Sequence, residues 1–295
     1  MTSVNYIEAK NIIEYRNSIN NSFAIINLNL GGSLEKLQIN GEQILADMQP
    51  ISYDTCYNSA ILFPFVNRID NGKYIFNKKE YQFKINEPAN NNALHGLVYN
   101  KKFVFEDEHT RINSTSITLS YTEKNKNPAF PYLYKITLIY TFSNTSVALE
   151  IKIDNIGTEN FPFTVGWHPY FYSKNLSKST LKFNADKKVI HNQKMITKNL
   201  EATNISELRD LESVNYDDCY SLRSGKVIFE TPTYNFTLNS NLKENYLQIY
   251  TPENKNAIAI EPITGISDSF NNKVGLQLLK PNTSFSSIYT LSVDI

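Results

Sequence analysis

The chain has 295 residues, and its 29 lysines and arginines balance its 29 aspartates and glutamates, so the formal net charge is zero. Nucleic acids and anionic membranes select proteins with a basic surplus, and this balance therefore argues against both as partners. All-β architectures commonly reach roughly 200–250 residues as one unit, so we expect residues 1–295 to form a single domain.

The N-terminal residues show no basic leader followed by an apolar segment, and no run of about 18 or more apolar residues occurs in the chain. We therefore expect neither a secretory signal nor a membrane span. The two cysteines, Cys56 and Cys219, are too few and too far apart to suggest a disulfide framework or a zinc site. Reduced thiols in a cytoplasmic protein are the expectation that follows.

In the first third of the chain, short apolar segments from Ser22 to Asn40 flank the pair Gly31–Gly32, a pattern typical of a hairpin. An apolar run then leads into the pair Asn67–Arg68, and a polar loop from Glu87 ends at His95. Taken alone, Arg68 is explained as a surface residue beside a turn, and His95 as a loop histidine that caps backbone carbonyls.

The middle of the chain alternates apolar and polar residues with a period of two, which predicts strands at 117–121, 136–142 and 147–154. In the last of these, Val147, Leu149, Ile151 and Ile153 share one face. Alternation this regular indicates an antiparallel sheet with one face toward water.

The same alternation reaches His168 in the segment Gly166-Trp167-His168-Pro169-Tyr170-Phe171. It places His168 on the face of Thr164 and Gly166, whose small side chains leave room for a ligand beside the imidazole. Proline cannot donate a ladder hydrogen bond, so we expect the strand to end at Pro169.

Alternation is lost from Asp186 to Tyr216, a length typical of a binding loop or lid, with a short helix predicted at 204–208. The adjacent acids Asp217 and Asp218 follow. As solvated loop carboxylates they need no function.

Strands return at 227–231, 234–238, 246–250, 257–261 and 289–295. In Ala257-Ile258-Ala259-Ile260-Glu261-Pro262, Glu261 ends a row of alanines, and Pro262 again predicts a strand end. Many short strands, almost no helix and no internal repeat predict an all-β fold, a large antiparallel β-sandwich.

A histidine and a glutamate at strand ends can together open a sugar hemiacetal. A base takes the proton of the anomeric hydroxyl while an acid protonates the ring oxygen, and re-closure on the other face gives the other anomer. His168, with a reference pKa near 6.5, suits the acid role, and Glu261, with one near 4.3, suits the base role. This chemistry requires no metal and no cofactor. Of the neighbouring aromatics Trp167, Tyr170 and Phe171, we expect one or two to touch a ligand.

Six motifs then occur in the order found in the aldose 1-epimerase (galactose mutarotase) family, which this chain resembles from about residue 20 to its C-terminus. They are Phe65-x-Asn67-Arg68, Asn92-Ala93-Leu94-His95-Gly96, Gly166-Trp167-His168-Pro169-Tyr170-Phe171, Asp217-Asp218-x-Tyr220, Leu247-Gln248-x-Tyr250-Thr251 and Ala259-Ile260-Glu261-Pro262. The glycine followed by His-Pro-Tyr-Phe is the most specific of them.

The resemblance implies a galactose mutarotase-like β-sandwich that binds a monosaccharide on an open concave sheet face. It implies that His168 is the general acid, that Glu261 is the general base and that His95 is a second proton donor or positioning group. Four residues match positions that bind sugar hydroxyls in the family: Asn67, Arg68, Asp217 and Gln248. Asp218 stands where many members have histidine, which leaves open which acid contacts the sugar, and the segment after Glu261 resembles a shorter branch of the family.

Three other functions are compatible with parts of the pattern. A mutarotase of hexose 6-phosphates would need further arginines or lysines for the phosphate, and Arg68 is the only arginine that the motifs connect to the site. A carbohydrate-binding protein without turnover would not need both His168 and Glu261. A metal hydrolase is disfavoured because the four histidines show no short ligand spacing. We expect a monomer or a weak homodimer that interconverts the anomers of a free aldohexose such as glucose or galactose.

Overall fold

The computed structural model describes residues 2–253 and 256–295. This part of the chain consists mainly of antiparallel β-strands, which confirms the predicted all-β class with little helix. Its helical segments are single turns: η1 (Glu8–Lys10), α1 (Tyr53–Cys56), η2 (Leu176–Lys178) and α2 (Ser269–Asn272). Each helix in the described ranges is too short and too polar to cross a lipid bilayer.

The N-terminal sheet is an antiparallel meander in which each strand pairs with the next along the chain. Its strands are β1 (Thr2–Ile7), β2 (Ile12–Asn17), β3 (Ser22–Asn27), β4 (Ser33–Ile39) and β5 (Glu42–Gln43). The predicted hairpin is β3–β4, and Gly31 and Gly32 in its connection have φ values of 67° and 68°. Only glycine adopts this left-handed region without steric cost, which explains the pair.

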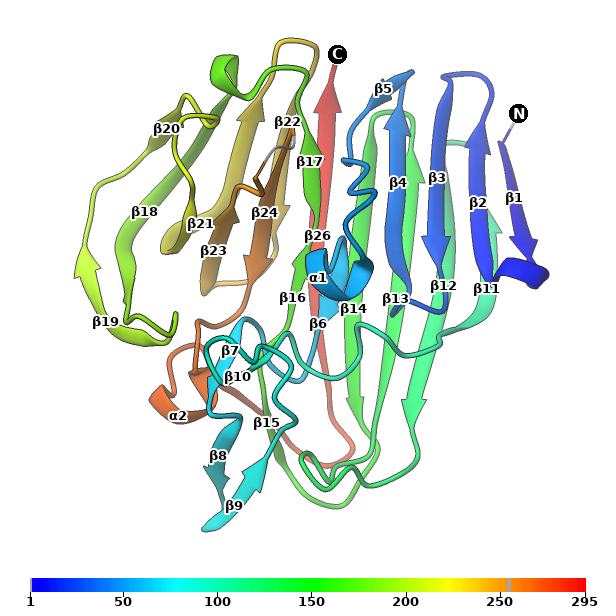
Figure 1. The fold of residues 1–295 in the computed structure, drawn as a ribbon. Coiled ribbons are helices and arrows are strands. Elements are labelled where there is room, and N and C mark those ends of the chain that lie inside the picture. Colours follow the sequence, from blue (N-terminus) through cyan, green and yellow to red (C-terminus); the bar gives the residue numbers. More distant parts are fainter. Residues whose placement is uncertain (1, 254–255) are drawn as a thin grey trace.

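A second, much larger antiparallel sheet runs the full width of the molecule (Figure 1). In spatial order its strands are β11 (Val104–Thr110), β12 (Ser114–Glu123), β13 (Tyr134–Ser143), β14 (Ser146–Asn155), β26 (Ser284–Asp294), β22 (Asn235–Ser240), β21 (Asp217–Glu230), β23 (Asn245–Tyr250), β24 (Ala257–Ile263), β16 (Gly166–His168) and β6 (Ala60–Leu62). Beside this path, β17 (Tyr170–Tyr172) pairs with β24, and β18 (Thr180–His191) pairs with β21, β19 (Thr197–Ala202) and β20 (Glu207–Arg209).

The N-terminal sheet stands in front of β12 and β13 in Figure 1, and apolar side chains of the two sheets form one core between them. The predicted alternation of β14 is confirmed, because Val147, Leu149, Ile151 and Ile153 are buried and the residues between them are partly exposed. Contacts across the core include the stacked rings of Tyr15 and Phe142, whose centroids are 4.4 Å apart. The architecture is therefore the expected β-sandwich.

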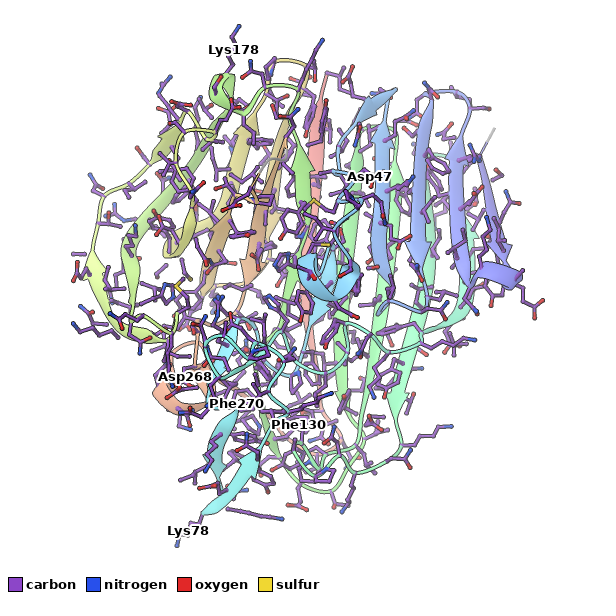
Figure 2. The ribbon with its side chains drawn as sticks, in the orientation of Figure 1. Asp47, Lys78, Phe130, Lys178, Asp268 and Phe270 are labelled. Atoms are coloured by element: carbon purple, nitrogen blue, oxygen red, sulfur yellow. The ribbon has the colours of Figure 1, made fainter. Side chains whose placement is uncertain are left out.

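Short strand pairs at one end of the large sheet build the surroundings of the candidate site. They are β7 (Arg68–Asp70) with β10 (Asn92–Leu94), β8 (Lys73–Phe76) with β9 (Lys79–Gln82), and β15 (Phe161–Phe163) with β25 (Gln277–Leu279). Figure 2 marks Asp268 and Phe270 at α2, beside β8. The ring of Phe270 packs 4.9 Å from that of Tyr74, and the Asp268 amide donates to the Arg68 carbonyl at 2.7 Å, which fixes the backbone of β7.

The segment from Asp186 to Tyr216 was predicted to be irregular, and this prediction is wrong for much of its length. β18 extends into the segment, and β19 and β20 lie within it. The predicted helix at 204–208 is also wrong, because Glu207–Arg209 forms β20, which pairs with Thr180–Lys182. These strands lie toward one end of the large sheet (Figure 1), and most residues of β19 are exposed or only half-buried. A strand without one fully buried face carries no clear alternation, which explains the error.

The two prolines behave differently. β16 ends at His168, as Pro169 predicts, but β24 continues through Pro262 to Ile263, so that prediction is wrong. β24 pairs with β16 at Ile263 and with β17 from Ala259, and no pair joins these strands at Pro262. The sheet does not require a backbone N–H from residue 262 on that side, so proline is tolerated inside this strand.

Candidate active site

One pocket of about 300 Å³ is lined by all seven residues that the sequence assigned to catalysis or to binding of sugar hydroxyls. These seven residues come from segments far apart in the chain: Asn67 just before β7, Arg68 at the start of β7, His95 after β10, His168 at the end of β16, Asp217 at the start of β21, Gln248 in β23 and Glu261 in β24. The sandwich therefore brings together residues that are far apart in the sequence.

The register of β24 places His168 beside Glu261. Gly166 pairs with Ile263 and Tyr170 pairs with Ala259, so the residues midway between these pairs, His168 and Glu261, lie opposite each other. Opposite residues of an antiparallel pair point to the same face. His168 Nε2 lies 3.4 Å from Glu261 Oε1, and the two side chains are only 6% and 4% exposed.

The small residues around this pair have a different function from the one predicted. Thr164, Gly166, Ala257 and Ala259 do not line the pocket. A Cβ on Gly166 would lie 2.5 Å from Cγ2 of Ile263, so this glycine allows β16 and β24 to approach closely. The small side chains therefore set the spacing of the two strands, and the pocket is formed by other walls.

His95 follows β10 in a left-handed conformation with φ of 60°. Its backbone N–H donates to the Asn67 carbonyl at 2.9 Å, and its ring stands perpendicular to that of His168 with the centroids 5.0 Å apart. A Cβ at residue 96 would lie 2.2 Å from the Phe63 carbonyl oxygen, so Gly96 is required beside it. The buried His95 Nδ1 has no hydrogen-bond partner among the described residues.

Asn67, Gln248 and Asp217 form a hydrogen-bonded row along one side of the pocket. Asn67 Nδ2 donates to Gln248 Oε1 at 3.1 Å, and Gln248 Nε2 donates to Asp217 Oδ1 at 2.7 Å. Asp218 is the other acid of the adjacent pair, and it forms an ion pair with Lys188 at 2.8 Å away from the pocket lining. The geometry therefore favours Asp217 as the acid that faces a ligand.

Glu87 belongs to the pocket and was not predicted. Its carboxylate accepts from Arg68 Nε at 3.0 and 3.1 Å and lies 2.9 Å from Arg68 Nη2. Arg68 Nη1 in turn donates to Asn67 Oδ1 at 3.2 Å. Glu87 begins a polar loop in the sequence, and no local pattern indicates that it pairs with an arginine of another segment.

Tyrosines supply the apolar surface of the pocket. Tyr57, Tyr170 and Tyr250 line it, and Tyr250 is 36% exposed. Of the three aromatics considered from the sequence, only Tyr170 is in the lining, because Trp167 and Phe171 are buried in the core. The expectation that one or two of them touch a ligand stays a prediction, with Tyr170 as the candidate in the lining.

Burial dominates the electrostatics of the pair. It lowers the pKa of His168 from 6.5 to about 4. Burial also raises the pKa of Glu261 well above its usual value, and the neighbouring Asp217 carboxylate adds to this rise while Arg68 opposes it. Burial, helped by the positive charges that His168 and Arg68 can carry, lowers the pKa of His95 well below 6.5. Both shifts favour the form in which the pair of His168 and Glu261 holds one proton and carries no net charge.

This donor set suits a small ligand with many hydroxyl groups. Amides, a guanidinium and carboxylates offer hydrogen bonds in both directions, tyrosine rings offer flat apolar surface, and the pair of His168 and Glu261 offers a proton acceptor and a proton donor. Within residues 2–253 and 256–295, no group of three or more His, Cys, Asp or Glu side chains has the arrangement of metal ligands.

Comparison with known proteins agrees with this description. A sequence model of the family described as aldose 1-epimerase matches residues 13–292. The uncharacterized protein YihR of Escherichia coli K12 is 24% identical over 279 residues, which are 88% of each chain. The structure of a galactose mutarotase-like protein from Clostridium acetobutylicum superposes with a TM-score of 0.85 at 21% identity, over 100% of this chain and 98% of that one. The galactose 1-epimerase of Lactobacillus acidophilus NCFM gives a TM-score of 0.82 at 14% identity, with 100% and 98% coverage.

The fold is therefore that of the galactose mutarotase-like proteins. Because the family model extends over nearly the whole sequence, the chain belongs to the aldose 1-epimerase family. The predicted family and fold are both confirmed.

Proposed function

We propose that this protein is an aldose 1-epimerase that interconverts the α and β anomers of a free aldohexose such as glucose or galactose. The observation that supports it most is the position of His168 Nε2, 3.4 Å from Glu261 Oε1, in a pocket otherwise lined by hydrogen-bonding side chains and tyrosines. Two proton-handling groups this close can act on the two oxygens bonded to one anomeric carbon.

In the proposed reaction, the Glu261 carboxylate takes the proton of the O1 hydroxyl while the His168 imidazolium gives a proton to the ring oxygen O5. The C1–O5 bond breaks, C1=O1 forms, and the product is the open-chain aldehyde. Rotation about the C1–C2 bond and reversal of both proton transfers close the ring on the other face. No charge accumulates on the sugar, because one proton arrives as the other leaves.

The protonation state of the pair fits this cycle. One proton shared by two groups is the number that the reaction needs, whether it rests on His168 or on Glu261. Burial favours the neutral pair, whereas the positive charge of Arg68 and a hydrogen bond from the sugar O1 hydroxyl favour the ionised Glu261. Binding of the sugar therefore draws the pair toward the reactive arrangement.

Six side chains around the pair would hold the sugar. Asn67, Gln248 and Asp217 present a connected row of amide and carboxylate groups to its hydroxyls. Arg68 supplies donors beside them, and His95, whose charged form burial disfavours, lines the pocket beside His168 as a positioning group. Tyr250 at the pocket mouth offers a face for the C–H side of the ring.

Polarimetry on freshly dissolved α-D-glucose and α-D-galactose tests the proposal. We expect the wild-type protein to accelerate mutarotation, and His168→Asn and Glu261→Gln each to lower kcat about 10²–10⁴-fold, the usual contribution of a general acid or base. Arg68→Ala should mainly raise KM. Sugar binding in calorimetry without faster mutarotation would contradict the proposal and indicate a carbohydrate-binding protein. Near-normal rates in both of the first two variants would contradict the assigned roles.

A further inference from the structure

Glu87 occupies the side of Arg68 that could otherwise bind an anion. A guanidinium binds phosphate or carboxylate best through two parallel N–H groups. In this pocket the pair formed by Nε and Nη2 faces Glu87, at 3.0 and 2.9 Å, and Nη1 donates to Asn67 Oδ1 at 3.2 Å. The side chains of Arg68 and Glu87 are only 14% and 16% exposed, so solvent screens the pair little.

The surrounding structure holds Glu87 in this position. The buried Asn92 donates from Nδ2 to Glu87 Oε2 at 2.8 Å and to the Lys194 carbonyl at 2.8 Å. The backbones of Glu87 and Asn92 exchange hydrogen bonds of 3.1 and 3.2 Å. Burial opposes ionisation of Glu87, but the hydrogen bonds and charge of Arg68 and the bond from Asn92 outweigh it and lower the pKa of Glu87. The carboxylate is therefore fixed and charged.

Once Glu87 is paired with Arg68, the described pocket lining has no lysine or arginine left without an acidic partner. Arg68 is the one lysine or arginine among its described lining residues. Lys194, which supports the network through its carbonyl, has its own ammonium 3.4 Å from Asp70. The other acids of the lining, Asp217 and Glu261, contribute no positive charge in either protonation state, and burial lowers the pKa of both His95 and His168, which disfavours their charged forms. An anionic substituent on a ligand would therefore enter a half-buried site without a counter-charge, which is strongly unfavourable.

We propose that Glu87 determines the charge specificity of this pocket, admitting uncharged sugars and rejecting sugar phosphates and uronates by occupying the guanidinium of Arg68. The inference rests on the proposed function and adds a substrate class and a residue to it. Removing the charge of Glu87 should leave Arg68 with a free pair of donors and a net positive charge, the arrangement that favours a phosphate.

The test compares kcat/KM for glucose, glucose 6-phosphate and glucuronate at fixed ionic strength in wild type, Glu87→Gln and Glu87→Asp. We expect the wild type to prefer glucose strongly, and Glu87→Gln to raise the ratio of either anionic sugar to glucose at least tenfold, mainly through KM. Glu87→Asp, which keeps the charge, should retain the wild-type ratio. Glu87→Ala serves as a second uncharged variant if the glutamine protein does not fold.

Glu80→Gln is the matched control, because it makes the same charge change at an exposed residue of the β8–β9 hairpin that lies 3.5 Å from Lys73 and does not line the pocket. It should leave the ratio unchanged. If Glu87→Gln lowers kcat/KM equally for neutral and anionic sugars, Glu87 only positions Arg68 and the inference is wrong. Equal use of glucose and glucose 6-phosphate by the wild type would overturn it as well.

Calorimetric binding separates this inference from the proposed function. If no aldose shows faster mutarotation, the proposed function fails, and the affinities of glucose and glucose 6-phosphate for wild type and Glu87→Gln are compared instead. A shift of tenfold or more toward the phosphate in the variant supports the role of Glu87. An unchanged ratio, or no binding of either sugar to either protein, overturns it.

Discussion

The close approach of β16 and β24 sets the distance between His168 and Glu261, and Gly166→Ala tests this. The added Cβ would lie 2.5 Å from Ile263 Cγ2 and 3.1 Å from the Pro262 carbonyl oxygen. Carbon atoms in contact are ordinarily about 3.5–4.0 Å apart, so the two strands must separate by roughly 1 Å. A shift of that size in a preorganised site costs about 10²-fold in rate, and overpacking costs about 1–3 kcal/mol of stability.

We therefore expect Gly166→Ala to lower kcat in polarimetry about a hundredfold and to lower Tm, measured by differential scanning calorimetry. Adding Ile263→Ala removes Cγ2 and should recover part of the rate. Gly157→Ala is the control, because a Cβ there would meet its nearest neighbour, Asn155 Oδ1, at an ordinary 3.4 Å. Wild-type rate and Tm in Gly166→Ala would refute the role assigned to the strand spacing.

Three further predictions follow from burial. Because the folded-state pKa of Glu261 is raised, the native protein keeps a proton that the unfolded chain loses above about pH 4.5, so this residue costs stability as pH rises. The Tm of Glu261→Gln should exceed that of wild type by more at pH 8 than at pH 5, and a constant difference would contradict this. The turnover rate should stay level from neutral pH down to about pH 5 and fall near pH 4, the lowered pKa of His168; a midpoint near 6.5 would contradict the burial of its imidazole. We also propose that the chain unfolds as one domain, because residues from Ile13 to Val293 share one core; two separate calorimetric transitions would oppose it.

The sequence determined the fold class and the candidates for the acid and the base, because both depend on short-range patterns. Alternation with period two marks buried and exposed faces within a single strand, and it correctly gave the buried face of β14. The same alternation failed from Asp186 to Tyr216, where strands lacking a fully buried face carry no such signal. The predicted strand end at Pro262 was also wrong. A strand tolerates a proline where the neighbouring strand does not need its backbone N–H, and this depends on the pairing at that position.

The tertiary structure alone decided how these residues meet. Asn67 and Gln248 are hydrogen-bonded although 181 positions separate them in the chain, and Gly166 is opposite Ile263 only because of the strand register. The ion pair of Arg68 with Glu87 likewise joins two segments, and neither local sequence indicates that they are in contact. The apolar and polar alternation of a strand reflects which of its faces is buried, so it can be recognised from the sequence. Strand register and the pairing of charged residues depend on long-range packing. The charge of the pocket can therefore be determined only from the folded structure.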